Sequence, residues 1–395
     1  MNQRKVIILG HIGDLSGPYA TVRRCTMYGL ALREAGHHVE FVIPVSETSG
    51  KVKSHNGFIV HSFQHGSPHA SIGRRILARL QAWWWLAQRM STHQMDWLLL
   101  YNVGIEGVVY ALTARLWGTQ IAISNEDVRY HPEDATLSDK VRLFLLEWAD
   151  GWLPRLSDFN MGISTFLRDR LQKIAPNIPA VVIPPMHGEH IYADAQSVSV
   201  LQKEYMLEDA VVIGYFGSFW IVNGVKNLLL AVRQLVDEGL PIKVLIAGRM
   251  AQGLDCDDVA DLIPTLRLEK QVIYMGVLSQ TEVFDAMGAC DILTVPRSDH
   301  VANEAGVPTK LGEYLFLGKA VVAAAVGDIP LYVRDGEDGL LIPPGDVSAL
   351  VVALRRLVVD ANLRQHLATN ALEAGYRGFY FKNAAKPFVD FVSME

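Results

Sequence analysis

Short runs of apolar residues alternate with longer amphipathic segments along almost the whole chain. In the first half the apolar runs lie at 6–9, 39–43, 58–62, 97–101, 121–124 and 181–183. The segments between them have the length and periodicity of helices, at 22–35, 74–90, 107–117, 140–148 and 166–174. Strands that are apolar throughout are typical of parallel sheets buried on both faces. The pattern therefore predicts an α/β domain with helices on both sides of a parallel sheet.

The same pattern restarts after residue 210. Apolar runs lie at 211–216, 244–247, 272–275, 292–295, 320–324 and 340–342. The helices expected between them include 225–238 and 281–287, the second of which is opened by a capping box of Ser279 and Glu282. A turn-rich break at 184–188 is the best candidate for a linker. We therefore expect two facing Rossmann-like, doubly wound domains, 1–186 and 187–379, with a cleft between them.

Composition narrows the class of protein. Half of the 395 residues are hydrophobic and 20% are charged, which is typical of a globular α/β protein. The net charge of −6 argues against a nucleic-acid-binding protein. Three widely spaced cysteines fit a reducing compartment, and no apolar run is long enough to predict a membrane-spanning helix. We expect a cytoplasmic protein.

Ligands of open α/β sheets bind beyond the carboxyl ends of the strands, where helix N-termini attract phosphate. Three loops fit that position, at 10–17, 217–226 and 303–314. The first lacks the G-x-G-x-x-G spacing of dinucleotide-binding proteins. In the third, Pro308 suits the first position of a helix, and Lys310 then lies in its first turn, against the preference of the helix dipole. A bound diphosphate would explain why a cation, Lys310, stands in the first turn of this helix. The alternative is a surface lysine paired with Glu313.

Several segments in a fixed order carry a resemblance to a known family. They are 272–276, 291–293, 308–314, 318–323 and 339–346. Together they resemble the C-terminal domain of family 4 glycosyltransferases, which are retaining enzymes of the GT-B fold. The resemblance covers roughly 210–375 and is weaker in the first half, where 35–39 and Ser164 match typical positions. It implies a nucleotide-sugar donor on the C-terminal domain and an acceptor on the N-terminal domain. It also implies a final helix, within about 380–395, that packs back on the N-terminal domain.

The donor residues implied by the resemblance are only partly present. Glu313 matches the second glutamate of the family's E-x7-E signature, which holds the nucleotide ribose. Ala305 stands at the first glutamate, and Glu304 is adjacent. The family's diphosphate-binding Arg and Lys fall on Ser218 and Asn223, neither of which is basic. The candidate donor site therefore includes these residues of the second half: Gly217, Ser218, Lys226, Arg249, Arg297, Glu304, Gly306, Thr309, Lys310 and Glu313. Arg249 and Arg297 fit equally well as solvated loop charges.

Acceptor-side candidates lie in the first half. The family usually has a histidine after the strand that corresponds to 121–124, and this chain has Glu126 and Asp127 there. Either carboxylate is a candidate to orient the acceptor hydroxyl, and at least one of them equally fits a loop or capping role. His11 is the third catalytic candidate, with Gly13 and Gly17 beside it in the first loop. Asp255, Asp257 and Asp258 have the spacing of a metal site but fit better as caps of a helix near Val259, so we expect no metal.

The segment 74–90 combines basic residues with three consecutive tryptophans. At helical spacing, Ile76, Leu77, Leu80, Trp83, Trp84 and Ala87 form its apolar face. Basic residues beside interfacial tryptophans are typical of helices that lie on anionic membranes. Arg74, Arg75, Arg79, Trp83 and Trp84 are therefore candidate membrane contacts. The alternative is an ordinary helix whose apolar face covers the first sheet.

Together these observations predict a metal-independent, retaining glycosyltransferase. It would move a sugar from a nucleotide diphosphate sugar to an acceptor hydroxyl, with a lipid-linked or polysaccharide precursor as a possible acceptor. Two alternatives share the fold: a nucleotide-sugar epimerase, and a catalytically idle protein that binds nucleotide sugars. The second alternative would explain why Ser218, Asn223 and Ala305 stand where the family has residues that contact the donor.

Overall fold

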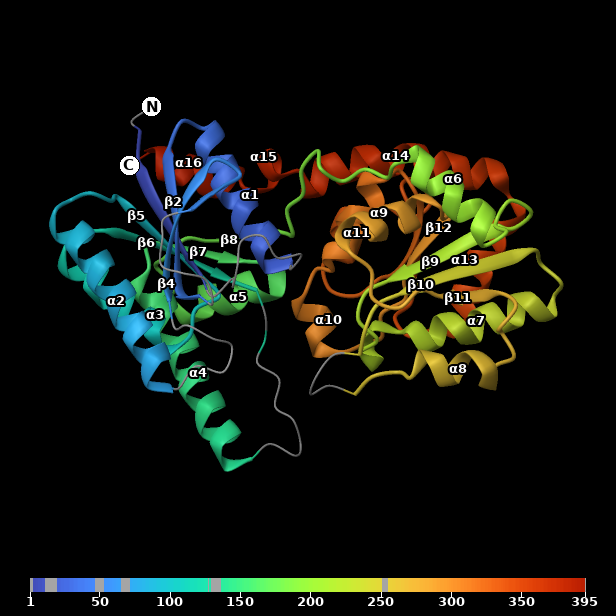
Figure 1. Cartoon of the computed structure of the whole chain (residues 1–395), viewed down its shortest axis with the longest axis horizontal. Coiled ribbons are helices and arrows are strands. Elements are labelled where there is room, and N and C mark those ends of the chain that lie inside the picture. The colour runs from blue at the N-terminus through green and yellow to red at the C-terminus, as the bar shows by residue number, and fades with distance from the viewer. Residues whose placement is uncertain are drawn as a thin grey trace. The chain divides into compact units, whose positions relative to one another are not determined.

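The chain divides into two compact units, each built around its own sheet. The computed structural model describes residues 3–10, 20–46, 53–64, 72–126, 128, 136–250 and 255–394. Unit 1 is Met1–Met186 with Phe381–Glu395, and unit 2 is His187–Tyr380. The boundary at Met186 lies inside the linker expected at 184–188 (Figure 1). Each unit is described separately below.

Unit 1 contains an eight-stranded sheet in the order β3-β4-β2-β1-β5-β6-β7-β8. The strands are β1 Lys5–Gly10, β2 His38–Ser46, β3 Lys53–His55, β4 Phe58–Gln64, β5 Trp97–Tyr101, β6 Gln120–Asn125, β7 Phe159–Gly162 and β8 Ala180–Val182. All neighbouring strands pair in parallel except β3, which runs antiparallel to β4 at the edge. The strand order reverses between β1 and β5, so a ligand site is expected beyond their carboxyl ends.

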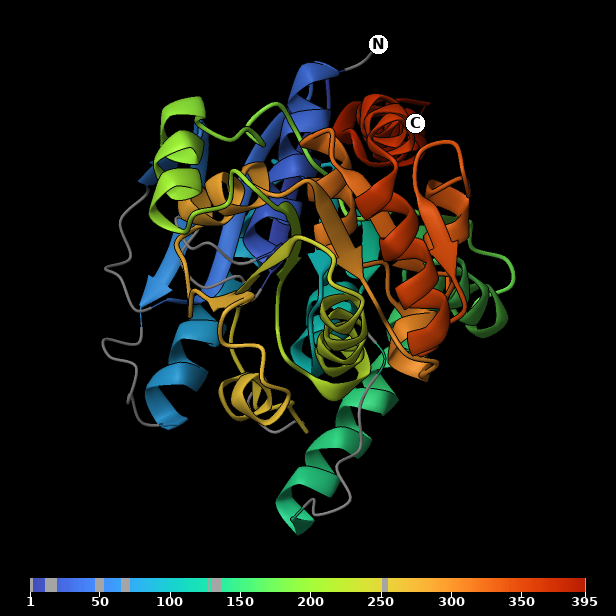
Figure 2. The same ribbon diagram turned by 90° about the vertical axis from the view of Figure 1, so that its right-hand side faces the viewer.

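Helices cover both faces of this sheet. They are α1 Ala20–Glu34, α2 Ile72–Ser91, α3 Ile105–Leu116, α4 Leu137–Leu156 and α5 Thr165–Ile174. Side chains of α2, α3 and α4 join Leu98 and Leu100 of β5 in one buried cluster. The first turns of α4 extend beyond the rest of this layer in two perpendicular views (Figure 1 and Figure 2).

The end of the chain packs on unit 1. It forms α15 Phe381–Ala384 and α16 Lys386–Met394. Phe388 of α16 is fully buried, with its ring centroid 6.1 Å from Tyr28 of α1 and 6.4 Å from Trp97 of β5. The ring centroids of Phe391 and Phe159 are 4.5 Å apart. These aromatic contacts attach the last helix to the face of the sheet that α2, α3 and α4 do not cover.

Unit 2 has a six-stranded parallel sheet in the order β11-β10-β9-β12-β13-β14, which is the doubly wound order of a Rossmann fold. The strands are β9 Val211–Phe216, β10 Ile242–Ala247, β11 Val272–Tyr274, β12 Ile292–Val295, β13 Ala320–Ala324 and β14 Leu340–Ile342. Its helices are α6 Ala195–Glu204, η1 Ile221–Asn223, α7 Val225–Asp237, α8 Val259–Thr265, α9 Gln280–Gly288, α10 Val301–Ala305, α11 Thr309–Phe316, α12 Ile329–Tyr332, α13 Val347–Val359 and α14 Ala361–Phe379. The strand order reverses between β9 and β12.

The structure differs from the sequence-based expectation at a few elements. The capping box of Ser279 and Glu282 is present at α9. The strands β3 and β7 were not predicted; each is only three or four residues long. The helix expected to end at 148 continues to Leu156, with Pro154 inside its last turn. The segment 303–314, expected to be a loop before one helix, contains α10 as well as the start of α11.

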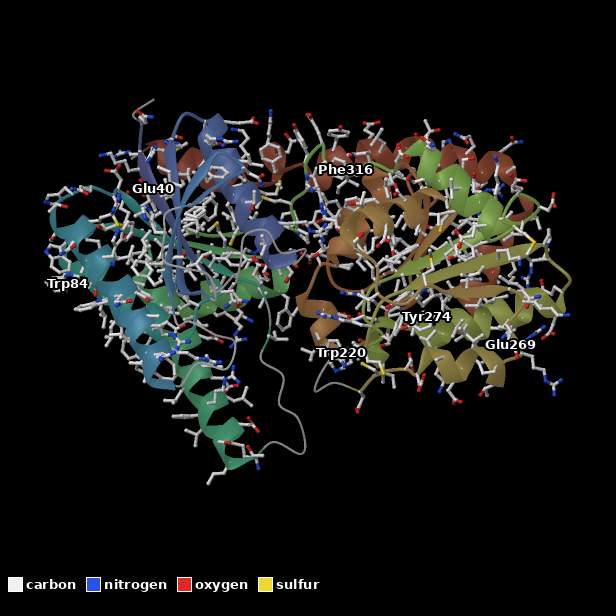
Figure 3. The ribbon with its side chains drawn as sticks, viewed as in Figure 1. Glu40, Trp84, Trp220, Glu269, Tyr274 and Phe316 are labelled. Atoms are coloured by element: carbon white, nitrogen blue, oxygen red, sulfur yellow. The ribbon has the colours of Figure 1, made fainter. Side chains whose placement is uncertain are left out.

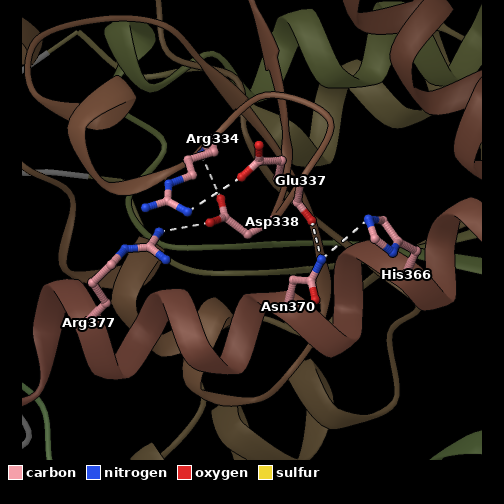
Figure 4. Close-up of polar contacts among 6 residues, drawn as sticks. All are labelled: Arg334, Glu337, Asp338, His366, Asn370 and Arg377. Atoms are coloured by element: carbon pink, nitrogen blue, oxygen red, sulfur yellow. Dashed lines mark hydrogen bonds and ion pairs between the residues drawn. The ribbon is translucent and has the colours of Figure 1, made fainter.

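A buried carboxylate joins the loop before β14 to α14 (Figure 4). Asp338 accepts hydrogen bonds from the backbone N–H of Arg334, at 2.6 Å, and from the guanidinium of Arg377 in α14, at 2.8 Å. Asn370 of α14 donates to the carbonyl of Glu337 at 2.8 Å. In contrast to Asp338, the Glu337 side chain is exposed and contacts Arg334 only at 3.5 Å. The loop is thus held to the helix mainly through Asp338.

We predict that Asp338→Asn lowers the free energy of unfolding by about 1–3 kcal/mol, because it removes the charged acceptor of two part-buried hydrogen bonds. Glu337→Gln is the matched control, and it should change stability by less than about 0.5 kcal/mol because exposed ion pairs contribute little. Urea unfolding of both variants measures the difference. Equal effects of the two substitutions would contradict this account of the loop.

Candidate functional site

The loops that follow β9 and β10 touch through their backbones at the point where the strand order of unit 2 reverses. Gly217 and Gly248 have φ angles of +148° and +154°. A Cβ atom on Gly248 would lie 1.8 Å from the carbonyl oxygen of Gly217. Only glycine fits at Gly248, because no other residue leaves room for this backbone contact. Because it has no side chain, Gly217 also leaves room on the side that faces α11.

Lys310 places its ammonium group in that space. It lies in the first turn of α11, and its Nζ atom is 3.9 Å from the centroid of the Tyr215 ring. A Cβ atom on Gly217 would be 3.2 Å from Nζ, so glycine leaves room for the lysine. Nζ is enclosed by protein atoms and has no hydrogen-bond partner among the residues that the structure describes. Burial, with a smaller contribution from the charge of Arg297, holds the pKa of Lys310 well below its usual value.

Arg297 brings a second cation to the same place. It follows β12, and its Nη1 atom donates to the carbonyl of Gly306 at 3.2 Å. Its Nε atom is enclosed and, within the described part of the chain, has no hydrogen-bond partner. Burial lowers the pKa of Arg297 to about 10. The alternative of a solvated loop charge is therefore wrong for Arg297.

Two neighbouring cations with unused N–H groups form a site for an anion. Enclosing a charge without a partner is costly, and an anion that accepts hydrogen bonds from both groups removes that cost. Lys310 is also at a helix start, where free backbone N–H groups favour phosphate. The arrangement suits a diphosphate, whose several oxygens can reach two donors at once.

Glu313 lies one turn after Lys310 on α11 and is buried. Its charge partly offsets the lowered pKa of Lys310, so the two side chains are electrostatic neighbours. Both groups are withdrawn from solvent, and the alternative of a surface lysine paired with Glu313 is therefore wrong. Pro308 also differs from expectation: it precedes α11 as the capping residue, and Thr309 is the first helical residue.

Ser218 and Asn223 stand at the two positions where a cation was expected, and their side chains are hydrogen-bonded to each other. The side-chain amide of Asn223 donates to Oγ of Ser218 at 2.9 Å and to its carbonyl oxygen at 3.3 Å. The hydroxyl of Tyr215 donates to the same carbonyl at 2.7 Å. These groups are neutral and hold the loop after β9 in shape. The positive charge of this site comes instead from Arg297 and Lys310, on the β12 side of the sheet.

The remaining donor candidates lie around this centre without forming part of the cation pair. Lys226 and Arg249 are exposed, so Arg249 fits the alternative of a solvated loop charge. Glu304 is exposed on α10. Gly306 supplies the carbonyl that binds Arg297, and the carbonyl of Thr309 lies 3.1 Å from Nε2 of His187.

In unit 1, Glu126 belongs to a buried polar network beyond β5 and β6. Its carboxylate forms an ion pair with Arg24 and accepts hydrogen bonds from Tyr101, at 2.7 Å, and Ser124, at 3.1 Å. The hydroxyl of Tyr28 lies 3.2 Å from Oγ of Ser124. Burial raises the pKa of Tyr28 to about 12, so this phenol stays protonated. Both oxygens of Glu126 are engaged, which favours a positioning role over that of a base.

Sequence reasoning missed the partners of Glu126. Arg24 and Tyr28 are spaced i and i+4 on α1, which puts them on one face of that helix. This spacing is the only local signal, because their contacts with β5 and β6 are long-range. The other acceptor-side candidates, His11, Gly13, Gly17 and Asp127, lie outside the described residues.

In the part of the chain that the structure describes, no group of three or more His, Cys, Asp or Glu side chains has an arrangement that could hold a metal ion. Asp258 caps α8, where its side chain accepts from the N–H of Asp261, as the sequence predicted. Asp257 accepts from the backbone N–H of Lys226 at 3.2 Å.

The candidate membrane residues lie on α2. Arg74, Arg75 and Trp84 are exposed, and Arg79 is partly exposed. Trp83 is half-buried, and its indole N–H donates to Thr113 of α3 at 2.9 Å. Of the apolar face expected for this helix, Ala87 is buried, whereas Ile76, Leu77 and Leu80 are exposed. The alternative in which this face covers the sheet therefore holds only for Ala87 and, in part, for Trp83. Among the described helices, none has both the length and the hydropathy needed to cross a membrane.

Known proteins match part of this chain in sequence and both of its units in fold. Residues 210–360 match the family model "Glycosyl transferases group 1". The α-D-kanosaminyltransferase of Streptomyces kanamyceticus is 24% identical over 268 residues, which are 66% of this chain and 67% of that protein. The D-inositol 3-phosphate glycosyltransferase of Stackebrandtia nassauensis is 28% identical over 202 residues, 50% of this chain and 44% of that protein. The chain thus spans about two thirds of the first relative and less than half of the second.

A solved structure with the same fold is Anabaena Alr3699/HepE in complex with UDP-glucose. It superimposes with a TM-score of 0.71 at 17% identity and covers 100% of each chain. The match extends over both units and identifies the fold as the GT-B fold of glycosyltransferases.

The enclosed ammonium of Lys310 predicts that diphosphate binding takes up a proton. A diphosphate stabilises the charged form of Lys310, so binding raises a pKa that is well below normal in the free protein. Above the free-state pKa of Lys310, binding therefore requires proton uptake and weakens as the pH rises. UDP is a suitable probe at pH 8, where its phosphates are fully ionised because their last pKa is about 6.

Calorimetry in two buffers of different ionisation enthalpy measures the protons taken up. Lys310→Met should abolish this uptake, weaken UDP binding and stabilise the free protein, because methionine needs no hydration. Lys226→Met removes an exposed lysine and is the matched control. The same proton uptake in the Lys310→Met variant and the wild type would exclude Lys310 as the titrating group.

Proposed function

We propose, from the match of residues 210–360 to the family model of group 1 glycosyltransferases, that the protein is a retaining, metal-independent glycosyltransferase. It moves a sugar from a nucleotide diphosphate sugar to an acceptor hydroxyl. The observation that carries the proposal is the pair of enclosed cations, Lys310 and Arg297, at the reversal point of the unit 2 sheet. HepE has been solved in complex with UDP-glucose, and a nucleoside diphosphate is the class of ligand that this pair suits.

In this proposal α11 holds both ends of the leaving nucleotide. Lys310, together with the free backbone N–H groups of the first helical turn, binds the diphosphate from one side. Arg297 binds it from the β12 side. Glu313, one turn further, accepts hydrogen bonds from the ribose hydroxyls, which are neutral donors. The carboxylate and the cations thus recognise different parts of one ligand.

The same cations serve the chemical step. When the bond between sugar and diphosphate breaks, negative charge grows on the departing phosphate. Positively charged groups already fixed at that point stabilise the charge without reorganisation and can do so without a metal ion. The acceptor hydroxyl attacks from the face that the diphosphate leaves, and so the anomeric configuration is retained. The departing phosphate is then also the nearest base for the hydroxyl proton.

Unit 1 is the acceptor side in this proposal. The network of Glu126, Arg24 and Tyr101 fixes the end of β6, from which the chain continues to Asp127. Glu126 is a positioning residue here, because its carboxylate is already occupied. A lipid-linked or polysaccharide precursor is the proposed acceptor class, and the basic and aromatic residues of α2 would then contact an anionic membrane from the cytoplasmic side.

The first test concerns the donor anchor. Glu313→Gln keeps the side-chain volume but removes the charge, and a hydrogen bond to a charged group contributes about 1.5–3 kcal/mol. We expect UDP to bind roughly tenfold to a hundredfold more weakly. Glu304→Gln, on exposed α10, is the control and should bind UDP as the wild type does. Calorimetric titration measures both. Unchanged affinity in Glu313→Gln and in Lys310→Met would move the donor site away from α11.

The second test is stereochemical. The product should keep the anomeric configuration of the donor, which NMR coupling constants of the isolated product report. An inverted product would exclude the retaining mechanism. Release of an epimerised nucleotide sugar without any acceptor would favour the epimerase alternative, and binding without turnover would favour the idle one.

A further inference from the structure

We propose that the outer faces of α2, α3 and α4 form one continuous surface that docks on an anionic lipid bilayer, with α3 and α4 contributing as much as α2. This inference rests on the proposed membrane contact of α2 and extends it to two helices that the sequence did not single out. The three helices lie side by side on one face of the unit 1 sheet, where their inner residues share a buried cluster.

The two ends of α2 pack differently: its last turns bury Leu86 and Met90 against the sheet, whereas its earlier turns bury small residues and expose large ones. Small residues, Ala78 and Ala82, point inward and are buried. Large apolar residues point outward: Leu77 is 56% and Trp84 is 59% exposed. Figure 3 shows Trp84 on the outer side of the helix. A helix that exposes its largest apolar side chains needs a further partner to cover them.

The next helix, α3, also exposes large apolar residues, although it buries Val108 and Tyr110 in the shared cluster. Ala111 and Ala114 of α3 are fully buried against the sheet, whereas Leu112 is 54% and Leu116 is 75% exposed. The hydrogen bond from Trp83 to Thr113 ties α2 to α3, so their outer faces adjoin. The apolar surface therefore continues from α2 to α3 without an intervening element.

The apolar surface is most prominent on α4. Its exposed apolar residues are Leu137, Val141, Phe144, Leu145, Trp148 and Trp152. Leu137 is 79% and Phe144 is 66% exposed, and no residue from Leu137 to Trp148 is buried. Most of the six recur every three to four residues and so form one stripe along the helix. The first turns of α4 project from unit 1, which would let this stripe enter a bilayer further than the other two helices (Figure 2).

The charge of the three helices indicates which partner covers this surface. The three helices carry eight Arg and Lys residues against four Asp and Glu, although the chain as a whole has a net charge of −6. No acidic residue occurs in α2. An anionic bilayer is attracted to such a surface, at about 1 kcal/mol for each basic residue near it. A second copy of the same surface would bring the basic residues of the two copies together and be repelled. Tryptophans such as Trp84 and Trp148 also prefer the membrane interface.

The test compares the full-length wild type with three variants in co-sedimentation with vesicles of anionic phosphatidylglycerol and phosphatidylcholine. The α4 variant is Leu137→Ser/Val141→Ser/Phe144→Ser, which changes no charge. The α2 variant is Arg74→Glu/Arg75→Glu/Arg79→Glu. The matched control is Val200→Ser/Met206→Ser/Val277→Ser, which removes exposed apolar residues from unit 2. We expect the partition coefficient to fall more than tenfold in the α4 and α2 variants and to stay at the wild-type value in the control.

Two further measurements separate this inference from the proposed function. The α4 variant should bind UDP as the wild type does and remain monomeric by light scattering. If it binds vesicles like the wild type while the α2 variant does not, the extension to α4 is overturned and the α2 contact stands. A wild type that ignores the vesicles overturns both membrane contacts but not sugar transfer. A lipid-free wild-type dimer that the α4 variant dissociates would identify a second copy as the partner and overturn the inference.

Discussion

The donor side of this molecule depends on two basic side chains with nitrogen atoms that protein atoms shield from water. Lys310 and Arg297 lie at the start of α11 and the end of β12, and each has an enclosed nitrogen without a hydrogen-bond partner in the described structure. Such an arrangement destabilises the free protein, and the lowered pKa values of both groups express that cost. It persists because the surrounding backbone is held in place, through the contact of Gly248 with Gly217 and the hydrogen bonds between Ser218 and Asn223. The site is therefore arranged for its anion before the anion arrives.

The two basic residues of this site lie on other segments than the resemblance implies. This placement keeps the net charge of the site but changes its geometry. Ser218 and Asn223 lie after β9, whereas Arg297 follows β12 and Lys310 opens α11. All these positions are at the carboxyl edge of the two strands where the order of the sheet reverses. A diphosphate at that edge is within reach of either set of residues. The loss of basic residues from the first loop is thus no argument against donor binding.

The strands of unit 2 could be predicted because each is a continuous apolar run buried on both faces. The strands β3 and β7 could not, because runs as short as Phe159–Gly162 carry no periodicity. Lys310 and Glu313 were recognisable from their helix-start spacing, but their burial was not, because it depends on Tyr215 and Gly217, about a hundred residues earlier in the chain. The engagement of Glu126 by Arg24 escaped prediction for the same reason.

Amphipathic periodicity identifies a helix with two unlike faces, but it does not tell which face is covered by protein. In α2 the larger apolar side chains suggested the inner face, yet the sheet accepts Ala78 and Ala82. Small residues let a helix approach a sheet closely, and the tryptophans and leucines are then left on the outside. Small side chains line the sheet only along the earlier turns of α2, because Leu86 and Met90 are buried in its last turns. Where a helix beside a sheet carries one small-residue face and one large apolar face, the large face is the one to examine for a partner outside the chain.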